Sequence, residues 1–173
     1  MIYVTSDLHG YSLAKFKKLL EKAQFSDEDF CFVLGDVIDR GPDGIAILKW
    51  MMLQPNVELI MGNHESMLLA CKFLFPAVNS KARDELNEEN VEQYLNWLAN
   101  GAEPTLKSLF EAEPESVLAI LDYLEEASLF KKVSVNGRKF LLTHSGLANF
   151  DKDKLIDEYS LDELLWNRRT ISD

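Results

Sequence analysis

The chain has 173 residues, a length that fits one domain able to bury a hydrophobic core without disulfides. Apolar residues make up 47% of the chain and charged residues 27%, which is ordinary for a globular protein. The formal net charge is −11 and no basic stripe offsets it, so the composition argues against a nucleic-acid or an anionic-membrane partner.

The cysteines and the apolar runs favour a cytoplasmic protein. Cys31 and Cys71 both lie in apolar runs and form no CxxC pair, so we expect both to be reduced and buried. The first strand-like run begins at Ile2, which leaves no room for a signal peptide. The most apolar stretch, residues 67–78, is interrupted by a lysine and a proline and is too short to span a bilayer.

Three strand–turn–helix units follow one another at the start of the chain. Each begins with a run rich in β-branched or aromatic residues and continues, after a turn, into a pattern with apolar residues at helical spacing. The expected strands are 1–6, 30–34 and 57–61, and the expected helices are 12–24, about 42–53, and from the third turn to about 75. This order predicts a parallel α/β architecture with right-handed crossovers.

The pattern changes after this repeat. Residues from about 76 to 113 are acidic, mostly helical in pattern and without a strand, and they are too few for a core of their own. We therefore interpret them as an insertion in a single domain that spans 1–173. A helix is expected at about 115–127. A β-hairpin should follow it, because alternating apolar residues flank Asn136-Gly137, a strong hairpin signal.

Side chains that can bind metals follow the strands. Because the turns are separated by about one βαβ unit, parallel neighbouring strands should bring them to one edge of the sheet, where open α/β sheets bind ligands. All three histidines of the chain lie in such turns, which makes separate structural roles a poor explanation. The residues are Asp7 and His9 in the first turn, Asp36 and Asp39 in the second, Asn63 and His64 in the third, and His144 after the hairpin.

These donors indicate a metal-dependent reaction at phosphorus. Aspartate, asparagine and histidine without cysteine suit Mn²⁺, Fe²⁺ or Zn²⁺. A central aspartate can bridge two ions roughly 3.5–4 Å apart, an arrangement that permits displacement at phosphorus. Arg40, beside the candidate ligands, and Arg168, far along the chain, are candidate cationic contacts for the phosphoryl oxygens.

Four motifs in the same order resemble those of a known family. SDLHG, GDVIDRG, GNHE and THSG resemble the motifs of the metal-dependent phosphoprotein phosphatases, within the calcineurin-like metallophosphoesterases. With its WLANG and LLWNR stretches the chain is most similar to small bacterial and bacteriophage members, and the resemblance covers nearly the whole chain. It implies the calcineurin-like α/β sandwich, in which helices flank β-sheets. Ser6 departs from the first motif, which usually has glycine there.

The resemblance implies a metal ligand at each of five positions. Asp7 and His9 would hold the first metal, and Asp36 would bridge it to the second. Asn63 and His144 would complete the protein ligands of the second metal. Two divalent ions are the implied cofactors, with Mn²⁺ the one expected in vitro and Fe or Zn as alternatives.

The resemblance also implies the roles of the residues around the metals. His64 would protonate the leaving oxygen, while Asp39 accepts the other ring N–H and fixes the tautomer. Arg40 and Arg168 would hold the phosphate. A metal-bound hydroxide would attack in line, without a phosphoenzyme.

One departure from the family concerns the second metal. Members of the family have a further histidine after the WNR stretch, and this sequence has no fourth histidine. The resemblance therefore implies a domain that lacks its last C-terminal strand or strands. It also implies a weaker second site, served by Asp36, Asn63 and His144.

The resemblance favours a phosphomonoesterase that acts on phosphorylated serine, threonine or tyrosine in proteins. The alternative is a dinucleoside polyphosphate hydrolase of the same superfamily. Those enzymes typically have GNHD where this chain has Glu65, and this difference favours a phosphoprotein substrate. A second alternative is a degenerate module that binds phosphate without turnover, which the missing histidine suggests and the intact His64, Asp39 and Arg40 oppose.

Overall fold

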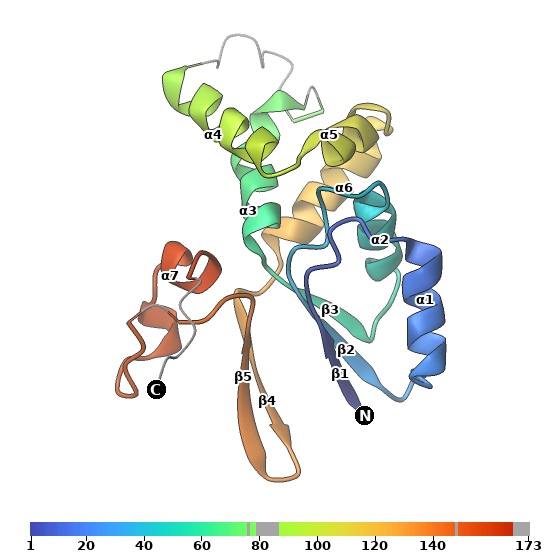
Figure 1. Ribbon diagram of the computed structural model, residues 1–173, viewed down its shortest axis with the longest axis vertical. Helices are drawn as coiled ribbons and strands as arrows, with labels where there is room; N and C mark the ends of the chain where they lie inside the picture. Colours follow the sequence, from blue (N-terminus) through green and yellow to red (C-terminus); the bar gives the residue numbers. More distant parts are fainter. Residues whose placement is uncertain (76, 79–86, 148, 168–173) are drawn as a thin grey trace.

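The first part of the chain forms a small parallel sheet. The computed structural model describes residues 1–75, 77–78, 87–147 and 149–167. Strands β1 (Ile2–Thr5), β2 (Phe30–Leu34) and β3 (Val57–Ile60) pair in the order β1-β2-β3 (Figure 1). Helices α1 (Leu13–Lys22), α2 (Gly44–Met51) and α3 (Asn63–Ala70) follow the three strands in turn. The expected parallel strand–turn–helix repeat is confirmed.

The first two helices are tied together where their turns meet. The hydroxyl of Ser12 caps α1 by accepting from the backbone N–H of Lys15, and Phe16 on the same helix is buried. Helix α2 begins at Gly44 rather than near Pro42, because Asp43 has a non-helical backbone with φ −97° and ψ 8°. The carboxylate of Asp43 instead accepts from the backbone N–H of Leu13, at 2.9 Å. A contact with another element therefore delays the start of α2.

The third helix is shorter than the sequence pattern predicts. Helix α3 ends at Ala70 and is followed by a separate 3₁₀ turn, η1 (Lys72–Leu74). Cys71 between them has φ −98° and ψ 11°, outside the helical region. The apolar pattern that runs on to Phe75 is thus shared by two elements, and Phe75 itself is buried in the core.

Three further helices cover the upper part of the molecule. Helices α4 (Glu88–Ala99), α5 (Glu103–Phe110) and α6 (Pro114–Glu125) gather around α3 (Figure 1). They share one hydrophobic core with the sheet and α2, to which Trp97, Leu109 and Leu124 contribute fully buried side chains. Helices α4 and α5 therefore belong to the same core as the sheet, through Trp97 on α4 and Leu106 and Leu109 on α5.

A hairpin follows α6, as the sequence predicts. Strands β4 (Phe130–Val135) and β5 (Arg138–Thr143) pair antiparallel. Asn136 and Gly137 have φ values of 50° and 77°, the left-handed conformation that a type I′ turn requires at both central residues. The amine of Lys131 joins the hairpin to the sheet through an ion pair with Glu58 of β3, at 2.9 Å.

The last described segment folds around its own small cluster. It contains the 3₁₀ turn η3 (Ile156–Glu158) and the short helix α7 (Leu161–Leu165), whose N-cap is Ser160. Ile156, Tyr159 and Leu164 form a hydrophobic cluster separate from the main core.

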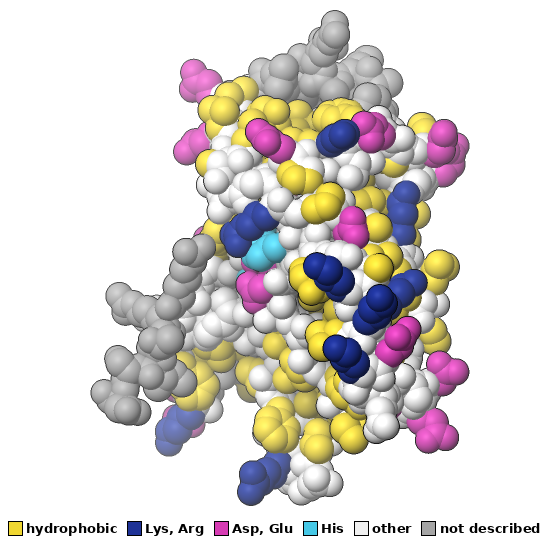
Figure 2. All heavy atoms as spheres, turned by 45° about the vertical axis from the view of Figure 1, so that its right-hand side comes forward, with side chains coloured by type: hydrophobic (Ala, Val, Ile, Leu, Met, Phe, Trp, Pro, Cys, Tyr) yellow, Lys and Arg dark blue, Asp and Glu magenta, His cyan; other side chains and the backbone are white. Residues whose placement is uncertain are grey.

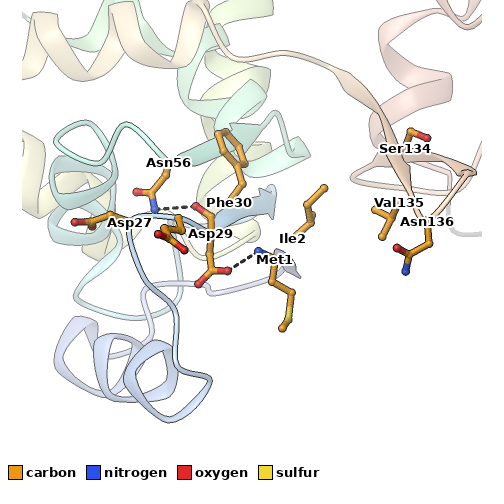
Figure 3. A pocket seen from close by; sticks show the side chains of 10 residues that line it. Met1, Ile2, Asp27, Asp29, Phe30, Asn56, Ser134, Val135 and Asn136 are labelled. Atoms are coloured by element: carbon orange, nitrogen blue, oxygen red, sulfur yellow. Dashed lines mark hydrogen bonds and ion pairs between the residues drawn. The ribbon is translucent and has the colours of Figure 1, made fainter.

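A hollow lies at the edge of the sheet where the parallel strands start. Figure 3 shows its lining side chains, which come from the start of β1, the loop before β2, and the hairpin tip. The N-terminal ammonium pairs there with Asp29, and the Asn56 amide donates to the carbonyls of Ser26 and Asp29. These contacts hold the loop before β2 in place, and the hollow lies away from the turns that carry the candidate ligands.

The structure also tests the expectations for the cysteines and the apolar stretch. Cys31 and Cys71 are buried and free, and burial raises the pKa of each thiol to about 11. Among the described residues, no helix has the length and apolar character needed to cross a membrane.

Candidate metal centre

The turns after β1 and β2 are joined by backbone hydrogen bonds. The N–H groups of Asp7, His9 and Gly10 donate to three successive carbonyls of the second turn, those of Gly35, Asp36 and Val37, at 2.8–3.2 Å. Gly10 and Gly41 cross so closely that a Cβ on either would overlap the backbone of the other. The two turns are therefore packed backbone against backbone, which fixes the positions of the side chains that they carry.

Five predicted site residues have left-handed backbones. The φ values of Asp7, His9, Asp36, Asp39 and Arg40 are 54°, 42°, 55°, 68° and 65°. Residues with a Cβ adopt this region at a cost, and they persist there only where their surroundings hold them. Gly10 and Gly35, beside these residues, have φ values of 63° and 71°, so ligands and glycines share the left-handed conformation in these turns.

Asp36 lies at the centre of the site. Its carboxylate is 3.6 Å from Nε2 of His9, 3.8 Å from Nε2 of His64 and 3.4 Å from Nε2 of His144. The backbone N–H of His64, in the first turn of α3, donates to Asp36 Oδ1 at 3.2 Å. The positive end of α3 thus supports the negative charge of a side chain that is only 6% exposed.

The hydrogen bonds of the histidines leave their Nε2 atoms as acceptors. Nδ1 of His9 donates to the Ile38 carbonyl at 3.2 Å, and Nδ1 of His144 donates to the Leu34 carbonyl at 2.8 Å. Burial lowers the pKa of His9 below its usual value, and the charge of Arg40 acts in the same direction. A neutral ring with its Nδ1 bonded to a carbonyl is the form in which histidine binds a metal through Nε2.

The donor atoms around Asp36 fit a cation. Nε2 of His144 is 2.8 Å from Asn63 Oδ1 and 3.4 Å from Asp36 Oδ1. Because the proton of the His144 ring is on Nδ1, all three of these atoms are acceptors and none donates a hydrogen to another. On the other side, Asp7 Oδ1 is 3.9 Å from Nε2 of His9. His9, Asp36 and His64 offer ligand atoms within 4.8 Å of one another. Converging oxygen and imidazole acceptors of this kind suit borderline divalent metals.

Arg40 reaches into the same group. One of its guanidinium nitrogens is 2.8 Å from Nε2 of His9 and the other is 3.2 Å from Nε2 of His64. In Figure 2 a histidine reaches the surface between a cationic and an acidic side chain, so the centre is open to solvent on this face. The structure therefore brings Arg40 to the ligands, as the sequence predicts. Arg168 lies outside the described residues.

His64 and Asp39 form a buried pair. Nδ1 of His64 donates to Asp39 Oδ2 at 2.6 Å, and the two side chains are 1% and 0% exposed. Oδ2 also accepts from the indole N–H of Trp97 at 2.8 Å, and the backbone N–H of Asp39 donates to Thr105 Oγ1 at 2.9 Å. The pair was predicted, whereas Trp97 and Thr105 were not. The WLANG stretch, with a tryptophan near the end of an acidic helix, was the available signal.

Glu65 lies behind the centre rather than in it. Its fully buried carboxylate accepts from the backbone N–H groups of Asp36, Val37, Ile38 and Gly62 at 2.8–3.3 Å. Burial raises the pKa of this carboxyl, the charge of Asp36 adds to the rise, and the backbone donors oppose it. Glu65 therefore shapes the loop that carries Asp36. The side chain of Glu65 faces the protein interior and is not in contact with the open side of the centre.

The sequence was compared with known families and proteins. The profile of the calcineurin-like phosphoesterases matches residues 1–172. A symmetrical bis(5'-nucleosyl)-tetraphosphatase of Buchnera aphidicola subsp. Acyrthosiphon pisum (strain APS) is 29% identical over 148 residues, 84% of this chain and 44% of the relative. The enzyme of the same name from Erwinia tasmaniensis is 34% identical over 100 residues, 56% of this chain and 36% of the relative. The chain thus spans less than half the length of these relatives.

One solved structure shares the fold. It is a crystal structure of a protein provisionally assigned as a diadenosine tetraphosphatase, with a TM-score of 0.61 and 17% identity. The match covers 99% of this chain and 60% of that chain. It confirms the expected α/β metallophosphoesterase fold. The expectation of a phosphorylated protein or peptide as partner is corrected, because these relatives are named for small nucleotides and not as protein phosphatases.

Proposed function

The chain belongs to the calcineurin-like phosphoesterase family, and from this membership and the centre around Asp36 we propose that it is a metal-dependent hydrolase of dinucleoside polyphosphates. The observation that carries the proposal is the convergence of Asp36, His9 and His144, with Arg40 beside them, in a chain whose relatives are named tetraphosphatases. The phosphoesterase chemistry follows from the family, and the dinucleoside substrate is the proposed part.

Two divalent ions would be held by the donors already described. Asp7, His9 and Asp36 would hold the first ion, while Asp36, Asn63 and His144 would hold the second. The first set contains two carboxylates, and the second contains the shared carboxylate, an amide oxygen and an imidazole. We therefore expect the second ion to bind more weakly, and Mn²⁺ to serve at both sites. Bound ions would activate water for attack on phosphorus and neutralise charge on the phosphoryl oxygens.

The residues of the chain itself would position the substrate and move the proton. Arg40 can donate from its planar fork to phosphate oxygens, a geometry that suits bidentate contacts. Because Nδ1 of His64 is held by Asp39, Nε2 is the atom left to exchange a proton with the leaving oxygen. The leaving group would be the phosphate end of a nucleotide, which needs less protonation than an alkyl alcohol.

Two exposed residues that follow the first turn in the chain could contact a nucleotide. Tyr11 lies two positions after His9 and is 48% exposed, and the amine of Lys15 is 6.0 Å from the centroid of its ring. An aromatic face can stack on a nucleobase, and an amine can contact phosphates. In this proposal, the pair would contact a dinucleoside substrate in a way that a small monophosphate would not use.

The test is hydrolysis of diadenosine tetraphosphate with Mn²⁺, with products separated by chromatography. The proposal predicts two molecules of adenosine diphosphate, and activity that chelation abolishes. Tyr11→Ala should raise KM for the dinucleotide and leave KM for p-nitrophenyl phosphate unchanged, with Phe110→Ala on α5 as an exposed aromatic control. Turnover of p-nitrophenyl phosphate without cleavage of the dinucleotide would refute the proposed substrate class.

A further inference from the structure

We infer that Trp97 is a positioning residue for the reaction proposed above, acting through Asp39 on His64. Its indole N–H donates to Asp39 Oδ2 at 2.8 Å, the same oxygen that accepts from Nδ1 of His64 at 2.6 Å. Trp97 and Asp39 are both fully buried and His64 is 1% exposed. The three buried side chains therefore form a hydrogen-bonded chain from Trp97 through Asp39 to His64, whose Nε2 is the atom proposed to give up the proton.

The Asp39 carboxylate depends on this indole. Its other oxygen, Oδ1, is buried and has no hydrogen-bond partner among the described residues. Both side-chain donors thus meet on Oδ2, and the backbone N–H of Asp39 is engaged elsewhere, with Thr105. A buried carboxylate without donors is costly, so the indole N–H supplies about half of the hydrogen bonding that keeps this one in place.

The two donors on Oδ2 also set the direction of the carboxylate. The terminal torsion of aspartate is broad, and a carboxylate with one donor can turn about it and exchange its oxygens. With Trp97 on one side, Oδ2 stays directed at Nδ1 of His64, and the imidazole plane is fixed with it. Loss of the indole N–H should leave His64 in place but poorly oriented.

The segment that carries Trp97 holds the neighbouring residue as well. The carbonyl of Gly101 accepts from the backbone N–H of Arg40 at 2.8 Å, and Gly101 has φ +98°. A Cβ at Gly101 would lie 2.9 Å from Arg40 Cγ. Trp97, Gly101 and Thr105 thus contact Asp39 and Arg40, two residues with left-handed backbones. The end of α4 and the start of α5 therefore support the turn after β2, which carries Asp39 and Arg40.

The kinetic test compares Trp97→Phe with the matched control Trp50→Phe, which removes an indole that packs on Phe16 away from the centre. The substrates are phenyl phosphate, with a poor leaving group, and p-nitrophenyl phosphate, with a good one. Trp97→Phe should lower kcat for phenyl phosphate by about 10- to 100-fold, the usual cost of an outer-shell contact. The loss should be smaller for p-nitrophenyl phosphate, with KM and Mn²⁺ binding unchanged. The control should lose nothing.

An equal loss for both substrates, a loss of bound Mn²⁺, or no loss at all would overturn the assignment. Since both substrates are monophosphates, the outcome does not depend on whether the natural substrate is a dinucleotide. If Trp97→Phe does not fold, the indole resonances of the wild type give a second test. The Trp97 N–H should resonate downfield of those of Trp50 and Trp166, and Asp39→Asn should move it. An unshifted resonance would contradict the inference.

Discussion

The guanidinium of Arg40 lies 2.8 Å from Nε2 of His9, the nitrogen assigned to the first metal. A cationic side chain and a metal ion cannot both face the same lone pair at close range, because their charges repel each other. Binding of the first ion is therefore expected to release Arg40 from His9. The released guanidinium is then available for the phosphate.

Arg40→Ala should separate metal binding from substrate binding. The variant should bind Mn²⁺ at the first site at least as tightly as the wild type, because a competing cation is gone. Loss of charge-assisted hydrogen bonds to phosphate should lower kcat/KM by about 10- to 100-fold. Calorimetric titration and steady-state kinetics measure the two effects. A fall in first-site affinity would show that Arg40 supports the metal instead of competing with it.

Asp36→Asn should remove both ions, because the Asp36 carboxylate lies 3.6 Å from Nε2 of His9 and 3.4 Å from Nε2 of His144, which are assigned to different sites. We expect activity at background and metal content well below that of the wild type, measured by elemental analysis. Asp122→Asn, on the exposed face of α6, is a control with the same chemical change and should behave as wild type. Retention of two ions in the Asp36 variant would disprove the bridging role.

His64→Asn should distinguish an acid from a ligand. His64 belongs to the group of donors around Asp36, yet its Nδ1 is held by Asp39. If His64 acts as the general acid, kcat should fall by about 10²- to 10⁴-fold with a poor leaving group, less with a good one, and metal content should not change. Loss of one bound ion from this variant would instead assign His64 to a metal.

The two metal sites should differ in affinity. Each has one histidine of its own, His9 in the first and His144 in the second. His144→Ala should abolish only the weaker Mn²⁺ site in a calorimetric titration, whereas His9→Ala should abolish only the tighter one. Activity in the wild type should saturate with the weaker site. Two equally tight sites would contradict the difference expected from the number of carboxylates.

The buried thiols predict a pH effect on stability. Burial raises the pKa of Cys31 and Cys71 to about 11, above the value of about 8.5 for an unfolded cysteine. The neutral thiols are compatible with the core below the unfolded pKa, and their contribution to stability is lost as the pH rises from there through about 11. Chemical denaturation should give a lower free energy of unfolding at pH 10 than at pH 8. This difference should be smaller in Cys31→Ser, because the serine hydroxyl does not ionise in this range. Thiol reagents should label the chain at pH 8 only after unfolding.

Local patterns were sufficient to predict several elements and the edge where ligands collect. The Asn136-Gly137 turn and the five-residue strand β2 depend on short-range preferences, and both match the structure. The spacing of Asp7 and Asp36 predicts their edge because parallel strands joined by crossovers point the same way. The proximity of Asp36 to His144, which follows an antiparallel hairpin, was instead implied by the resemblance to the family.

Contacts between distant segments could not be predicted from the sequence. Trp97 and Thr105 lie 58 and 66 positions from Asp39, and no local pattern encodes these hydrogen bonds. The start of α2 was misplaced because Asp43 bonds to α1, another contact outside its own helix. The inference from Glu65 to a phosphoprotein substrate was wrong, because one position of one motif did not distinguish this chain from relatives that are named tetraphosphatases. The left-handed backbone of Arg40 likewise has no signal in the sequence.

The crossing of Gly10 and Gly41 makes two separate motifs one mutational unit. Each glycine is without a side chain because the other loop occupies that space, so neither can vary while the other loop stays where it is. In a saturation-mutagenesis library, both positions should reject every other residue, although neither binds a ligand. A side chain at Gly10 should also displace Arg40, because it would push away the backbone of the neighbouring Gly41. The inheritance of the two motifs is therefore coupled by packing, independently of the chemistry that each one serves.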